Sequence, residues 1–143
     1  MSPKEYLQRV AHAEREIQSI KARIEHYQAL TLGSGMSMDN TPVTHSKGYS
    51  RTETIAVGII DALASLNANL GAYTASVSDA EKLIAQMPQE RYRRILTYRY
   101  LCGWKLQKIG ERMGYEDRNS IYRAHGWALA EFGKVMKKEK AGD

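Results

Sequence analysis

Apolar residues recur every three or four positions along two long stretches of the chain, and this spacing predicts two long α-helices. In residues 4–31 the recurring positions are Tyr6, Val10, Ala13, Ile17, Ile20, Ile24 and Tyr27. In the second stretch, which starts near Thr52 or Thr54, they are Ala56, Ile59, Leu63, Leu66, Leu70, Tyr73, Val77, Ala80, Ile84 and Met87. Each stripe is a heptad seam, so the helices can pair with each other as an antiparallel hairpin or with a second chain as a coiled coil.

Seven seam positions are the candidate oligomerisation residues: Val10, Ile17, Ile20, Ile24, Leu63, Leu66 and Leu70. Beside the first seam, Arg9 with Glu14 and Glu16 with Lys21 place opposite charges at flanking positions, which makes a parallel self-pairing charge-compatible. We therefore expect a homo-oligomer, with a dimer favoured. The pattern leaves open whether the seams pair within one chain or between chains.

Between the two seams the periodicity is lost. Residues 32–51 collect Gly, Ser, Asn, Asp and Pro, a composition typical of a flexible connector. The segment "GSGMSMDN" lacks the Gly-Lys-Ser/Thr ending of a phosphate-binding loop. We expect a disordered connector inside an N-terminal helical region, residues 1–87, that oligomerises or binds a partner.

The last third of the chain carries shorter helical patterns. Pro88 suits the first turn of a helix that runs to Gly103, with Ile95, Leu96, Tyr98 and Leu101 on its buried side. No segment of the sequence alternates with period two between turn residues, which is the pattern of a strand. The predicted class is all-α.

Two further short helices follow, joined by a glycine. Leu106, Ile109 and Met113 form an apolar stripe, Gly114 suits a left-handed C-cap, and Asp117 suits the N-cap of the next helix. That helix has apolar positions at Ile121, Ala124, Ala128 and Leu129. The pattern predicts a helix-turn-helix in a domain of residues 88–133, followed by a basic tail, 134–143.

The opposite face of the second helix is polar near its start. Arg118, Asn119, Tyr122 and Arg123 point away from the apolar stripe. Arginine can bond guanine in two places, asparagine can do the same with adenine, and a helix N-terminus favours phosphate. Gly126 lies inside this helix, so we expect either that the helix ends early or that a neighbour approaches closely there.

The stretch "ILTYRYLCGWKLQKIGERMGYEDRNSIYRAHGWALAEF", residues 95–132, resembles the fourth region of bacterial sigma factors. In that family an Arg-Tyr-Leu-x-Gly run leads into Leu-x-x-Ile-Gly-x-x-Leu/Met-Gly, and the recognition helix ends in Ala-Leu. In length and layout the chain resembles small bacteriophage regulators of late transcription, the ArpU and RinA type. The resemblance implies base contacts from Arg118, Asn119, Tyr122 and Arg123, and DNA backbone contacts from residues such as Lys105, Ser120 and Trp127.

Charge agrees with a nucleic-acid partner. The chain has 143 residues and a net charge of +5, and residues 88–143 carry 13 Lys/Arg against 7 Asp/Glu. A polyanion partner and a solvated basic surface both explain this excess. The start of the chain is charged, and no apolar run approaches the roughly 20 residues that a membrane span needs. We therefore expect a cytoplasmic protein with no membrane contact, in a bacterial host.

No catalytic constellation is apparent. His12, His26, His45 and His125 show no metal-binding spacing, and no nucleophile has an obvious base, so we expect neither an enzyme nor a cofactor or metal. The expected function is sequence-specific binding of double-stranded DNA by a transcriptional regulator, of phage or prophage late genes. The alternatives are a subunit like the phage small terminase, which also combines a helix-turn-helix with helical oligomerisation, and an adaptor of RNA polymerase that does not bind DNA.

Overall fold

The computed structural model describes the backbone of residues 1–39 and 46–142, and the side chains of these residues apart from 33–39 and 46–52. The described residues are helical almost throughout, and no strand occurs in either range. The elements are α1 (Pro3–Asp39), α2 (Ser46–Ala85), α3 (Glu90–Leu96), the π-helix η1 (Thr97–Leu101), α4 (Leu106–Met113) and α5 (Arg118–Gly142). The all-α class is confirmed.

The chain divides into two compact units. One contains Met1–Arg15 and Thr74–Asp143, and the other is Glu16–Tyr73. This division differs from the boundary expected at residue 87. The reason is that Leu7 of α1 and Ile84 of α2 are buried in the same core as α3, α4 and α5.

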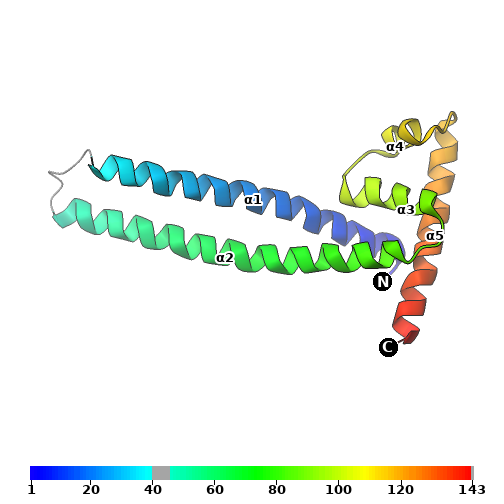
Figure 1. Cartoon of the computed structure of the whole chain (residues 1–143), viewed down its shortest axis with the longest axis horizontal. Coiled ribbons are helices and arrows are strands. Elements are labelled where there is room, and N and C mark those ends of the chain that lie inside the picture. The colour runs from blue at the N-terminus through cyan, green and yellow to red at the C-terminus, as the bar shows by residue number, and fades with distance from the viewer. Residues whose placement is uncertain (40–45, 143) are drawn as a thin grey trace. The chain divides into compact units, whose positions relative to one another are not determined.

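The unit Glu16–Tyr73 consists of parts of α1 and α2, which run side by side (Figure 1). Ile17, Ile20 and Leu66 are buried in it, while the other seam positions are half-buried, namely Ile24, Leu63 and Leu70. The seventh candidate oligomerisation residue, Val10, is buried in the other unit. The other six candidate residues are therefore at least partly covered within a single chain.

The helices extend into the stretch expected to be a connector. The structure assigns residues 32–39 to α1 and residues 46–51 to α2, so these parts of the expected connector 32–51 are corrected to helix. Glycine and serine weaken a helix by about 1 kcal/mol or less per residue without preventing it. Pro42, the first residue that cannot continue a helix, comes three positions after Asp39. Residues 40–45 lie outside the described residues.

The second helix is more apolar than the sequence pattern suggested. By length and composition alone, its stretch Glu53–Ala85 could cross a membrane, a test that the core helices of soluble proteins also pass. Only 11% of its most apolar window is buried in the single chain. The expectation that no apolar run approaches the length of a membrane span is thus corrected for α2.

The core of the unit that contains Met1–Arg15 and Thr74–Asp143 is built around α5. Both α3 and α4 pack against this helix. Its buried positions are Ile121, Ala124, Ala128, Phe132 and Val135. From α1, Leu7 is fully buried and the Tyr6 ring lies 5.8 Å from the Phe132 ring, centroid to centroid.

The helix expected over Pro88–Gly103 is shorter and not uniform. Its α-helical part, α3, has Gln89 as N-cap, so Pro88 precedes the helix instead of forming its first turn. After Leu96 the backbone widens into η1, in which the Cys102 N–H donates to the Thr97 carbonyl over 3.0 Å. Gly103 then takes a positive φ of 75°, a conformation that glycine adopts without strain.

The expected basic tail also differs. Residues 134–142 continue α5 without a break, and Val135 is buried there. Four lysines, one glutamate and one alanine in this stretch favour helix, and the apolar stripe continues through Phe132 and Val135. Asp143 lies outside the described residues.

Removing the Leu7 side chain tests this shared core. We expect Leu7→Ala to destabilise the unit by about 2–5 kcal/mol, the usual cost of a cavity at a fully buried leucine. Urea unfolding followed by the fluorescence of Trp104 and Trp127 measures it, because both tryptophans lie in this unit. Leu30→Ala, at a position 43% exposed, is the control and should change stability by less than about 0.5 kcal/mol. Equal, small effects from both substitutions would show that α1 contributes nothing to the core.

Candidate nucleic-acid interface

A glycine turn sets the angle between α4 and α5. Gly114 has φ 83°, and its N–H donates to the Glu111 carbonyl over 3.3 Å. The next N–H, of Tyr115, reaches back to the Gly110 carbonyl over 2.8 Å. These bonds satisfy carbonyls at the end of α4, and the expected left-handed C-cap is confirmed.

The start of α5 is capped by Asp117, as its sequence position predicts. The Asp117 Oδ1 accepts the Asn119 N–H over 3.1 Å, and the Asp117 carbonyl accepts the Ser120 N–H over 3.0 Å. A carboxylate here satisfies free amide groups and complements the positive end of the helix dipole. By contrast α4 begins after Lys105, which makes no side-chain capping bond.

The two helices approach each other closely through a glycine. A Cβ added at Gly110 would lie 3.2 Å from the Cβ and Cγ2 atoms of Ile121. Gly110 and Ile121 are buried, as is Ile109 beside them. This contact fixes which side of α5 faces inward, and the inward assignment of Ile121, Ala124 and Ala128 agrees with their burial.

The four residues expected to read bases lie on the opposite side. Arg118, Asn119, Tyr122 and Arg123 are all exposed, with Tyr122 at 50%. Among the described residues, the side chains of Arg118, Asn119 and Arg123 form no hydrogen bond or ion pair. Three donor side chains are therefore held out on the first two turns of a capped helix, free to bond a partner.

The three residues expected to contact a DNA backbone are less uniform. Lys105 and Trp127 are exposed, Trp127 at 55%, whereas Ser120 is half-buried. Lys105 immediately precedes α4, and Ser120 and Trp127 lie on α5. The expected backbone contacts therefore come from the start of one helix and the length of the other.

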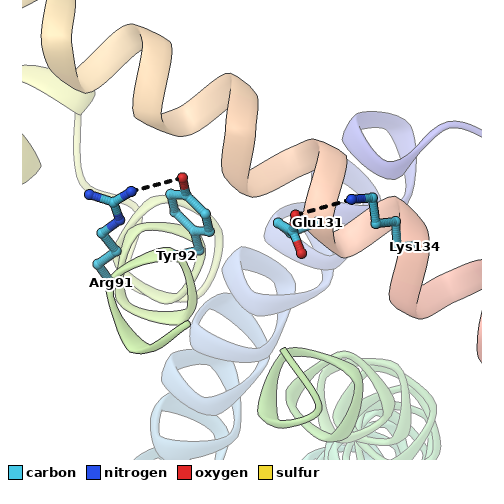
Figure 2. Close-up of polar contacts among 4 residues, drawn as sticks. All are labelled: Arg91, Tyr92, Glu131 and Lys134. Carbon is cyan, nitrogen blue, oxygen red and sulfur yellow. Dashed lines mark hydrogen bonds and ion pairs between the residues drawn. The ribbon is translucent and has the colours of Figure 1, made fainter. Parts of the chain in front are cut away.

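Several other cations in the last third of the chain are already engaged. Arg94 pairs with Glu90 over 2.8 Å, and Arg93 donates to the Met87 carbonyl. Figure 2 shows two more contacts: Arg91 of α3 donates to the Tyr92 hydroxyl, and Lys134 of α5 pairs with Glu131. Part of the basic excess thus serves the chain's own surface, whereas the side chains of Arg118 and Arg123 form no such contact.

Aromatic contacts fix the segment between η1 and α4. The Tyr98 and Trp104 rings are stacked, with centroids 4.5 Å apart and an interplanar angle of 3°. Lys108 Nζ lies 4.2 Å from the Trp104 ring centroid, a cation–π contact. Arg99 Nη1 donates to the Trp104 carbonyl over 3.1 Å. The sequence showed only a cluster of aromatic residues here, without their partners.

A histidine on α5 meets a tyrosine from η1. Tyr100 Oη and His125 Nε2 lie 2.9 Å apart. Burial, with the nearby charges of Arg99 and Lys4, lowers the pKa of His125 to about 4, and burial raises the pKa of the Tyr100 hydroxyl. Both groups are therefore neutral at neutral pH. Sequence reasoning missed this pair because a π-helix has no recognised sequence signal. The wider turn of η1 changes the direction in which the Tyr100 side chain points.

Gly126 behaves differently from both expected alternatives. The helix continues through it to Gly142, and an added Cβ would have no heavy atom within 4 Å. The expectations of an early helix end and of a close neighbour within the chain are therefore both wrong. The glycine leaves open space on the exposed side of α5.

Among the described residues, no group of three or more His, Cys, Asp or Glu side chains could hold a metal ion. Searches against protein-family models, curated proteins and solved structures found no match for this chain.

Replacing Gly126 tests the open space found beside it on α5. We expect Gly126→Ala to stabilise the chain by about 0.5–1 kcal/mol, because alanine restricts the unfolded backbone and nothing obstructs its methyl group. Thermal unfolding followed by circular dichroism measures the change. Gly110→Ala is the contrasting variant and should destabilise the chain, since its methyl group would press on Ile121. A loss of stability in Gly126→Ala would contradict the open space found there.

Proposed function

We propose that the chain is a sequence-specific DNA-binding regulator of transcription, in which α4 and α5 act as a helix-turn-helix and the start of α5 enters the major groove. The observation that supports this most is the unpaired set Arg118, Asn119 and Arg123, exposed beside Tyr122 on a helix whose other face is buried. Arg and Asn can each form two hydrogen bonds to one base edge.

Side chains just before α4 and along α5 suit contact with the DNA backbone. Lys105 and Trp127 are exposed, and Ser120 lies half-buried in the first turn of α5, where its hydroxyl can donate to phosphate. These contacts would orient α5, while base edges supply specificity. The resemblance to the fourth region of sigma factors and to phage late-transcription regulators supports the same assignment.

The charge of the helix face also favours DNA over a protein partner. Arg118 and Arg123 have no acidic partner among the described residues, although Glu116 and Asp117 precede them in the chain. Asp117 is occupied in capping. An adaptor that binds only RNA polymerase would not need Asn and Arg spaced over the first two turns of a helix.

Substitution of single side chains separates base reading from folding. We expect Arg123→Ala and Asn119→Ala to leave thermal stability unchanged and to lose about 1–3 kcal/mol of discrimination at particular base pairs. Ile121→Asp should unfold the unit and abolish binding of every kind, because Ile121 is 1% exposed. Fluorescence anisotropy with a selected duplex and its single-base variants measures the effects.

Arg23→Ala is the matched control, an exposed arginine in the unit Glu16–Tyr73, and should not alter base preference. Loss of stability in Arg123→Ala, or unchanged base preference in both surface variants, would argue against the recognition-helix assignment.

We further propose that two chains associate through the unit Glu16–Tyr73. Ile55, Val57 and Ile60 of α2 are more than half exposed, and so is Leu32 of α1. Four exposed large apolar side chains within one unit favour contact with another chain. Two copies of a short recognition helix would also raise the discrimination between sequences.

Sedimentation of the full chain tests this association. We expect a dimer at micromolar concentration and a shift to monomer in Ile60→Glu, whose exposed position lets the chain keep its fold. Asp61→Lys, the neighbouring exposed position, should remain dimeric. A wild-type monomer would refute the dimer, and a large ring would favour the function of a small terminase subunit.

A further inference from the structure

A half-open cleft of about 620 Å³ lies beside the start of α5, within the unit that contains Met1–Arg15 and Thr74–Asp143. One wall is a face of α1, on which Lys4, Gln8 and Arg15 follow one another at helical spacing. The other walls come from η1, the segment before α4, and α5. The polar and aromatic side chains there are Arg99, Tyr100, Tyr122 and His125.

The cleft is positively charged and no carboxylate lines it. Lys4, Arg15 and Arg99 line it, and among the described residues Lys4 and Arg15 form no ion pair or hydrogen bond. Arg99 uses one donor on the Trp104 carbonyl and keeps the others. With three cations and no carboxylate in its lining, the cleft attracts anions.

His125, in the wall of the cleft, is affected by these positive charges. Burial, then Arg99 and then Lys4, lower the pKa of His125 to about 4, so the positive charges act on the position that the ring occupies. Tyr100 Oη holds the ring through Nε2 over 2.9 Å, which leaves Nδ1 as the other ring nitrogen. An anion in the cleft would oppose Arg99 and Lys4 and so raise the pKa of His125.

We propose that this cleft binds the phosphate groups of one ligand through Lys4, Arg15 and Arg99. Lys4 and Arg15 lie eleven residues apart on α1, so they contact different phosphates. Arginine bonds phosphate with a planar pair of donors and lysine acts as a point charge, so the three side chains provide the donors that phosphate oxygens need. The cavity volume lies within the range of small-ligand sites. The phosphate comes from the backbone of a bound duplex or from a free phosphorylated small molecule.

The duplex is the favoured source, and this choice rests on the proposed function. Tyr122, assigned above to base contact, also lines the cleft. A duplex that places a base edge against Tyr122 would carry its backbone past the adjacent cations. In that case the first turns of α1 contribute to DNA binding as well as to the core.

Inorganic pyrophosphate tests the site itself. We expect pyrophosphate, added to the full chain, to shift the His125 ring signals in NMR saturably and to raise the pKa of His125, whereas sodium chloride at equal ionic strength does neither. Arg15→Gln should weaken this binding roughly tenfold, as expected for loss of a charged hydrogen-bond donor. Arg9→Gln is the matched control: Arg9 is an exposed arginine of the same helix that does not line the cleft.

Two results would overturn the site. One is a His125 response to pyrophosphate no larger than that to chloride. The other is equal weakening by Arg15→Gln and Arg9→Gln, which would reveal a general charge effect.

A duplex-binding assay then identifies the source of the phosphate. If the backbone occupies the cleft, Arg15→Gln lowers the slope of log affinity against log salt by about 0.9 relative to Arg9→Gln, and pyrophosphate competes with DNA. If pyrophosphate binds but both variants bind DNA equally, the site holds and serves a free phosphorylated ligand. If pyrophosphate binds and no duplex does, the proposed function fails while the phosphate site stands.

Discussion

The close packing of α5 against α4 determines which side of α5 is available to a partner. Gly110 lets the two helices approach so closely that an added Cβ would lie 3.2 Å from the Ile121 side chain, and the buried stripe continues through Ala124, Ala128 and Phe132. A helix with one face so constrained has no freedom to rotate about its axis. The exposure of Arg118, Asn119 and Arg123 follows from that contact, as does the direction in which they point. Loss of the Gly110–Ile121 contact would therefore alter both stability and recognition.

The same core joins distant parts of the chain. Leu7 and Tyr6 of α1 pack with α5, so the first turns of the chain belong to the unit that carries the proposed recognition helix. Their outer face adds Lys4 and Arg15 to the basic cleft beside Tyr122. Burial on one side of α1 and charge on the other thus support the proposed DNA surface together. Under the proposed function α1 would contribute to recognition, a role that its heptad seam alone does not suggest.

Local signals in the sequence were sufficient for much of the candidate site. Gly114 and Asp117 predicted the turn because each acts on its own backbone, and the three-and-four spacing around Ile121 predicted the buried face of α5. Contacts between distant residues were not predictable in this way. The cleft needs Arg15 beside Tyr122, and the Tyr100–His125 pair needs a π-helix that changes the register of η1. The end of α1 and the start of α2 were missed because their glycines and serines were taken as a connector. These residues lower helix propensity without excluding a helix.

Selection from a random pool of DNA duplexes with the purified full chain tests the central claim most directly. If Arg118, Asn119 and Arg123 read base edges, successive rounds should enrich a short shared sequence, and repeating the selection with Arg123→Ala should relax it at one or two positions. Each such position is worth about 1–3 kcal/mol, enough to be resolved after a few rounds. Recovery of duplexes with no shared sequence, by a chain that is folded and binds DNA, would show that α5 holds phosphates only. No enrichment and no retention of DNA would contradict the account as a whole.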